Sequence, residues 1–223
     1  MERSYKKRAL LEIVMKIVFL AAACMSVLCV ALICIFLFAN GLPAMGEIGV
    51  LNFLSGTRWK PGADIYGIFP MILGSIYVTA GALLMGVPVA LLTAIYLAFF
   101  CPQKLYRVLK PAVELLAGIP SVVYGLIGMM VLVPAVMELF HLKNGTCLFA
   151  AILVLAIMIL PSIISVSETA LNAVPPEYEE ASLALGATKI ETIFKVSIPA
   201  AKSGIVAGIV LGIGRAIGEA MAV

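Results

Sequence analysis

Long apolar runs separated by short polar stretches dominate the chain. They cover about residues 13–39, 68–100, 112–140, 148–166 and 203–223. Each run is long enough for a helix to cross the ~30 Å hydrocarbon layer of a membrane. The second and third runs exceed one crossing, so we expect their ends to lie in the interface or in loops. The pattern predicts an all-α, polytopic transmembrane helical bundle, with residues 1–223 forming a single transmembrane domain.

Prolines interrupt several of these runs, and the break around Pro120 and Ser121 is the most informative. Helix breaks are tolerated inside membranes where neighbouring protein or a water-filled cavity satisfies the freed backbone groups. One interpretation places Pro120 and Ser121 on a lined path through the bundle. The other is a packing kink, which is common for proline and glycine in membrane helices.

Composition and charge support a membrane protein and set its orientation. The chain is 63% hydrophobic and only 12% charged, whereas soluble domains contain about 25% charged residues. A net charge of +3 gives no indication of nucleic-acid binding. Lys and Arg concentrate at residues 3–8, 104–110 and 189–202, against Arg58, Lys60 and Lys143 on the other side. The positive-inside rule then places the N-terminus and the segment between the last two runs in the cytoplasm.

That cytoplasmic segment, Val166 to Lys202, holds five of the twelve acidic residues. Pro175 and Pro176 can open a short helix, whose first turn would carry acidic side chains that the helix dipole favours. Gly186 either ends this helix or permits a close backbone approach. A second short helix is expected over residues 189–196. The segment is either an ordinary amphipathic interfacial loop or a docking surface.

Arg215 and Glu219 are the two charges placed deep in an apolar run. Charges in a membrane are costly and face the protein interior. Their spacing of four lets them touch on one helical face, the same face as a ridge formed by Gly204, Gly208 and Gly212. Such ridges mark close helix packing. Two interpretations stay open: a structural ion pair, or an anion site in which the guanidinium binds oxyanion oxygens.

The order of residues in the cytoplasmic segment resembles the EAA motif of ABC-importer permeases. The matching positions are Glu180, Ala181, Ser182, Gly186 and, in the final Val-Ser-Ile-Pro, Pro199. The chain departs from the family pattern conservatively, with Ser182 in place of the second alanine. The resemblance implies that this loop, about residues 167–202, is a coupling helix that inserts into a cleft on a separate ATPase.

Three longer stretches, 59–70, 114–134 and 214–223, are similar to PstC-type permeases of the Pst phosphate importer. The resemblance implies a permease subunit in a bacterial plasma membrane, with inorganic phosphate as its cargo. It implies a PstA-like second permease, a PstB-like ATPase dimer and a PstS-like binding protein as partners. Such permeases have six spans, so we expect one further C-terminal helix beyond the five visible here.

Other functions were weighed against phosphate import. A permease for another oxyanion, such as sulfate or molybdate, would carry the same loop. An intramembrane enzyme would need catalytic pairs within the spans, but Asp64 and His141 both fall in outer loops. A role in reporting phosphate supply is allowed by the resemblance, although no residue demonstrates it. The chain has no G-x-x-x-x-G-K-[ST] stretch, so we expect a transport permease without enzymatic activity, cofactor or metal, whose ATP is hydrolysed by another subunit.

Overall fold

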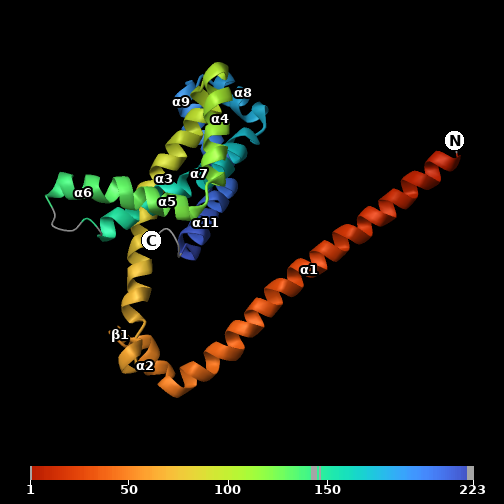
Figure 1. Ribbon diagram of the computed structural model, residues 1–223. Helices are drawn as coiled ribbons and strands as arrows, with labels where there is room; N and C mark the ends of the chain where they lie inside the picture. Colours follow the sequence, from red (N-terminus) through yellow and green to blue (C-terminus); the bar gives the residue numbers. More distant parts are fainter. Residues whose placement is uncertain (1, 142–144, 146, 220–223) are drawn as a thin grey trace. The chain divides into compact units, whose positions relative to one another are not determined.

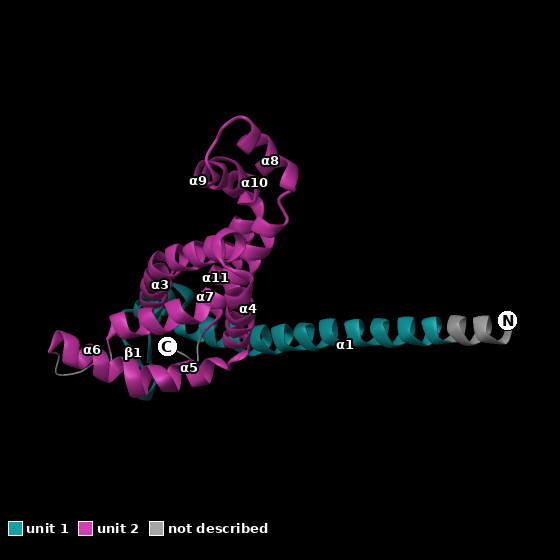
Figure 2. Ribbon diagram, turned by 90° about the horizontal axis from the view of Figure 1, so that it is seen from above, with its two compact units in different colours: residues 1–71 teal, residues 72–223 magenta. Residues whose placement is uncertain are grey.

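The computed structural model describes residues 2–141, 145 and 147–219. These residues are almost entirely helical, as the hydropathy pattern predicts. The chain divides into two compact units, residues 1–71 and 72–223, which Figure 2 colours separately.

The first unit consists of a long helix followed by a small hairpin. Its elements are α1 (Glu2–Ile48), α2 (Val50–Ser55), β1 (Trp59–Lys60), η1 (Pro61–Ala63) and β2 (Ile65–Tyr66). The strands pair antiparallel, and the Trp59 and Tyr66 rings pack edge to face with centroids 5.8 Å apart. Gly56 and Gly67 touch through their backbones, which leaves no room for a Cβ on either residue.

The second unit contains the remaining helices, three of which are five-residue π-helical segments. Its elements, in order, are α3 (Phe69–Ile95), η2 (Tyr96–Phe100), α4 (Gln103–Gly118), α5 (Ser121–Ile127), η3 (Gly128–Leu132), α6 (Val133–Phe140), α7 (Leu148–Asn172), α8 (Pro176–Ala184), α9 (Lys189–Thr192), η4 (Ile193–Ser197), α10 (Ile198–Ala200) and α11 (Lys202–Gly218). Figures 1 and 2 show α8, α9 and α10 gathered at one end of this unit, away from α5 and α6.

Helix α7 is the central element of the second unit. Leu155, Met158, Ile159 and Ile163 on this helix are completely or almost completely buried. They form one cluster with buried residues of α3, α5 and α11. Helix α7 also packs along α11 and against α4. The unit is therefore organised around one buried apolar helix, and the other helices expose much of their apolar surface.

Among the residues that the structure describes, four helical stretches are long and apolar enough to cross a membrane: Leu11–Ile48, Phe69–Phe100, Ser121–Phe140 and Leu148–Asn172. A fifth is obtained if Lys189–Ala200 and Lys202–Gly218, which meet at 68°, count as one span. The prediction of an all-α polytopic bundle is therefore confirmed.

The third apolar run exceeds one crossing, as expected, and its first residues lie outside the spanning part. The run begins inside α4, and the spanning part starts only at Ser121 because the chain breaks at Ile119 and Pro120. One predicted boundary is wrong. Helix α7 continues to Asn172, so the loop that connects it to α11 begins after that residue and not near 167. The polar side chains in the last turns of α7, Glu168 and Asn172, are hydrogen-bonded within the protein, so this part of the chain need not be a solvated loop.

Candidate functional site

The loop between α7 and α11 folds into two short helices that meet at a glycine, as the sequence predicts. Helix α8 ends in a left-handed turn, with φ +87° at Gly186. The Gly186 N–H donates to the Leu183 carbonyl and the Ala187 N–H donates to the Ser182 carbonyl, at 2.9 and 3.2 Å. This pair of bonds is the Schellman arrangement, which favours glycine at the position with positive φ. Gly186 therefore ends the helix.

Hydroxyl groups join the two halves of the loop. The Ser182 and Thr192 hydroxyls are hydrogen-bonded at 2.9 Å. The buried Ser197 hydroxyl donates to the Glu179 carboxylate at 3.1 Å. Ser182 is one of three residues that depart from the EAA pattern, with Val196 and Ile198. The structure gives its hydroxyl a role, because it holds α8 against α9. The angle between the short helices is thereby set by side-chain hydrogen bonds as well as by the turn.

A capping box begins α9. The Thr188 hydroxyl accepts from the Glu191 N–H at 3.3 Å, and the Glu191 carboxylate accepts from the Thr188 N–H and hydroxyl at 3.0 and 2.9 Å. These hydrogen bonds favour the ionised form, so they hold the pKa of Glu191 below its usual value. Lys195 lies 3.8 Å away and adds a smaller effect in the same direction.

The outer surface of this loop exposes both the motif residues and large apolar side chains. Glu180, Ala181, Gly186 and Pro199 are exposed, and Ser182 is half-buried. The apolar residues around them are also exposed: Tyr178, Leu183, Leu185, Ile190 and Phe194. Leu185, beside the glycine turn, is 90% exposed. Apolar side chains on a polar surface loop are typical of a protein interaction site.

The glycine ridge of α11 packs against α7. A Cβ on Gly204 would collide with the Ala170 Cβ. A Cβ on Gly212 would lie 2.7 Å from the Ile163 side chain, and one on Gly208 would lie 3.1 Å from the Ser167 hydroxyl oxygen. The predicted close-packing face is therefore present, and α7 is its partner.

Arg215 does not pair with Glu219 in the described part of the chain, so the expected i, i+4 contact is wrong. Helix α11 ends at Gly218 and Glu219 adopts an extended conformation, which removes it from the helical face. Arg215 instead donates to the Ser162 hydroxyl at 2.9 Å. Both residues line an open pocket of about 620 Å³, whose other walls come from α11.

The break at Pro120 is present, with Ile119 and Pro120 both in extended conformation. The Tyr124 hydroxyl donates to the Leu116 carbonyl at 2.8 Å and satisfies a backbone group at the end of α4. Pro120 is exposed and Ser121 half-exposed at the start of α5. Among the described residues, neither Pro120 nor Ser121 is hydrogen-bonded to Arg215.

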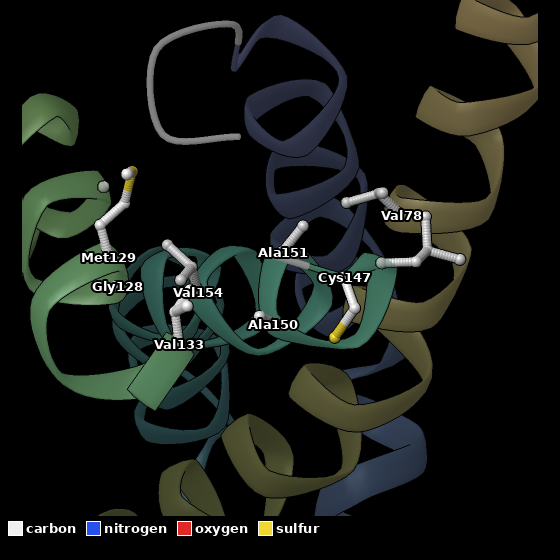
Figure 3. Close-up of a pocket in the computed structure, with 10 residues that line it drawn as sticks. Val78, Gly128, Met129, Val133, Cys147, Ala150, Ala151 and Val154 are labelled. Atoms are coloured by element: carbon white, nitrogen blue, oxygen red, sulfur yellow. The ribbon is translucent and has the colours of Figure 1, made fainter. Parts of the chain in front are cut away.

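A second pocket, of about 300 Å³, lies between α3, α7 and the η3–α6 region (Figure 3). Its labelled side chains, among them Val78, Met129, Cys147 and Val154, show only carbon and sulfur atoms in Figure 3. A Cβ on Gly128 would lie 2.5 Å from the Val154 side chain, so this glycine serves packing. The apolar walls suit hydrocarbon and offer little to an anion.

Sequence reasoning missed a buried carboxylate at the base of the loop. Glu168 was counted among the acids of the polar segment, yet it is 1% exposed and lies within α7. It accepts hydrogen bonds from the Tyr106 hydroxyl at 2.6 Å, Lys110 Nζ at 2.8 Å and Asn172 Nδ2 at 2.8 Å. The hydrogen bond to Glu168 is the main cause that raises the pKa of both Tyr106 and Lys110. The spacing of four in Tyr106–Lys110 and in Glu168–Asn172 places the members of each pair on one helical face, but it does not indicate that the two pairs meet.

Comparison with known proteins assigns the chain to a family. Residues 86–223 match the family described as binding-protein-dependent transport system inner membrane component. The chain belongs to this family.

Individual relatives extend the similarity beyond residues 86–223. The chain is 40% identical to the probable ABC transporter permease protein YqgH of Bacillus subtilis, over 99% of this chain and 72% of that protein. It is 35% identical to the phosphate transport system permease protein PstC of Mesorhizobium japonicum, over 91% of this chain and 68% of that protein. For PstC of Haemophilus influenzae the identity is 38%, over 77% and 61%. The resemblance to PstC-type permeases is therefore confirmed.

A solved structure shares the fold of the permease. A chain of the MetNI methionine ABC transporter, from a study of its inward-facing conformations, matches with a TM-score of 0.57 and 25% identity. The match covers 67% of this chain and 73% of that one. The protein is thus a multi-pass ABC transporter permease subunit, a class that is not itself enzymatic.

Proposed function

We propose that the permease forms half of the membrane pathway of an ATP-driven phosphate importer. The supporting observation is an exposed two-helix loop, turned at Gly186, in a chain that is 35–38% identical to PstC proteins. The permease would lie in a bacterial plasma membrane with its N-terminus in the cytoplasm, as the distribution of Lys and Arg predicts. A PstA-like permease would complete the pathway, and a PstS-like protein would deliver phosphate.

The loop from α8 to α10 is proposed to dock on a PstB-like ATPase dimer. Glu180, Ala181, Ser182, Gly186 and Pro199 would form the coupling surface together with the exposed apolar side chains around them. Leu185 is the sharpest test, because it is the most exposed of these and its replacement leaves the core intact. Leu185→Asp should reduce co-purification of the ATPase while leaving the Tm of the isolated permease unchanged. Undiminished co-purification would refute this docking surface.

The translocation path is proposed to pass Arg215. Its guanidinium uses one donor on Ser162, and it carries no carboxylate partner within the described residues. The remaining donors border the open pocket, so they are available to oxyanion oxygens. Glu219, just beyond the end of α11, would modulate the charge there. Pro120 and Ser121 remain predicted path residues, supported by the break in the helix that they open.

The cargo is the finer part of the proposal. A permease for sulfate, molybdate or another oxyanion would share the loop and the guanidinium. The similarity to a methionine transporter shows that this fold serves other cargo as well. The PstC relatives favour phosphate over these alternatives.

Uptake by the full complex in proteoliposomes tests the cargo and the path together. Labelled phosphate should enter with ATP, and excess sulfate or molybdate should not compete. Arg215→Gln should abolish uptake with assembly intact, and Arg215→Lys should restore part of it because the positive charge remains. Competition by sulfate or molybdate would overturn the phosphate assignment. Unchanged uptake by Arg215→Gln would remove Arg215 from the path.

A further inference from the structure

The buried Glu168 carboxylate ties the end of α7, from which the loop starts, to helix α4, which is distant in sequence. Glu168 and Asn172 lie on the last turns of α7, immediately before the chain turns into α8. Tyr106 and Lys110 lie one turn apart on α4, 62 and 58 residues away from Glu168. The Glu168 side chain is 2% exposed, whereas that of Lys110 is 33% exposed. A carboxylate that is desolvated in this way depends on all of its donors.

Helix α4 connects this cluster to the membrane spans. At its N-terminal end, it follows the π-helical segment η2 through Cys101 and Pro102. At its other end, the Tyr124 hydroxyl holds the Leu116 carbonyl across the break. A displacement of α4 therefore reaches the ends of two spans, α3 with η2 and the α5–α6 stretch.

The loop makes a second contact with the same region. Lys189, in the first turn of α9, donates to the Phe99 carbonyl at 3.2 Å and lies 5.6 Å from the centre of the Phe100 ring. That carbonyl lies in η2, where the π-helical geometry departs from the regular α-helical hydrogen-bonding pattern. The end of α7 and the loop that follows it thus hold both sides of the α3–α4 connection, the end of α7 through Glu168 and the loop through Lys189.

We infer that Glu168 is a positioning residue for energy coupling: it makes α4 move with the loop, so that a displacement at the ATPase contact reaches the α3–α4 connection. This inference rests on the proposed docking of an ATPase at the loop. The Lys189 contact is exposed and easily exchanged for water, whereas the Glu168 cluster is buried. Breaking the buried contact should therefore uncouple α4 while the loop and its docking surface stay folded.

Cys101 provides a natural reporter, because it lies in the α3–α4 connection and lines a pocket with Tyr106 and Asn172. The experiment uses the full complex in proteoliposomes with Cys24, Cys29, Cys34 and Cys147 replaced by serine. Maleimide labelling of Cys101 is measured without nucleotide and after trapping with ATP and vanadate. In the parent complex the two rates should differ about fivefold or more, the lower end of usual coupling factors.

Glu168→Gln and Lys110→Met should remove this difference while ATP is still hydrolysed, and combining them should add nothing further. Lys104→Met is the matched control. Lys104 lies on the same helix and makes no side-chain hydrogen bond or ion pair among the described residues, so Cys101 in this variant should be labelled as in the parent. If Glu168→Gln prevents assembly, Lys110→Met and Tyr106→Phe carry the test, since both leave the carboxylate in place.

The inference is overturned if labelling of the parent does not respond to nucleotide, or if Glu168→Gln and Lys110→Met respond as the parent does. A merely structural role would lower the yield of complex without changing the nucleotide response of the molecules that assemble. The labelling does not depend on the cargo. Absence of phosphate uptake by the parent would therefore refute the proposed cargo alone, and the labelling would still decide the role of Glu168.

Discussion

Replacing Gly186 with alanine is expected to weaken the interaction with the ATPase far more than the added methyl group suggests. Outside Gly186 and its two neighbours in the chain, no described atom lies within 4 Å of the position that a Cβ would occupy. The penalty therefore comes from the backbone alone, because φ is +87°. A left-handed conformation costs an L-residue roughly 1–2 kcal/mol. If the docked loop requires this turn, the competent population should fall by a factor of about 5–30.

The assay is the affinity of the purified ATPase for the permease pair in nanodiscs, measured for the parent, Gly186→Ala and Gly186→Asn. Asparagine tolerates the left-handed region better than alanine does. The dissociation constant should rise by about 5–30-fold for alanine and by clearly less for asparagine. Phosphate uptake should follow the same order, while the Tm of the isolated permease stays near that of the parent.

The reasoning is refuted if alanine binds the ATPase as tightly as glycine does. It is also refuted if asparagine is as weak as alanine, because the effect would then come from the side chain and not from φ. A large fall in the Tm for alanine alone would mean that the turn supports the whole bundle and not only the loop.

Two further predictions concern stability. Gly204→Ala should lower the Tm of the permease in detergent, because overpacking against Ala170 costs about 1–3 kcal/mol. Gly214→Ala is the control and should not lower the Tm, because that glycine lies on the same helix with open space among the described atoms. Equal effects of the two substitutions would contradict the packing role of Gly204. Because the pKa of Glu191 is lowered, its capping contribution is present at neutral pH and is lost as the pH falls through that lowered value. Amide hydrogen exchange around Thr188 should therefore accelerate on acidification relative to neighbouring amides after correction for intrinsic rates, and Glu191→Ala, which removes the carboxylate that accepts from the Thr188 N–H, should abolish this pH dependence.

Local patterns predicted much of the fold and part of the site. The apolar runs located the spans because helix length and hydrocarbon thickness are matched. The spacing of Gly204, Gly208 and Gly212 predicted a packing face because helical periodicity places them on one side. Gly186 was expected either to end the helix or to permit a close backbone approach, and its positive φ shows that it ends the helix. Each of these predictions uses information within a few residues of the feature.

Contacts between distant segments could not be predicted from the sequence. Nothing near Glu168 indicates that Tyr106 and Lys110 will surround it, so its charge suggested a solvated loop when it is buried in α7. Ser162 as the partner of Arg215 was equally hidden, because the expected partner, Glu219, was the nearest charge along the chain. For Arg215, helical spacing suggested a partner on the same helix. In both cases, tertiary packing supplied a partner from another helix.

The glycine contact between α7 and α11 has a mechanical consequence. Most helix interfaces can adjust their separation by exchanging rotamers on both sides, but the glycines of α11 have no rotamers to exchange, so only side chains of α7 such as Ile163 can adjust. The two helices can slide or turn together, but they have little freedom to move apart gradually. The ends of the loop that joins these helices are therefore held at a nearly constant separation. A displacement that arrives at the loop should then be received by α7 and α11 as a single body.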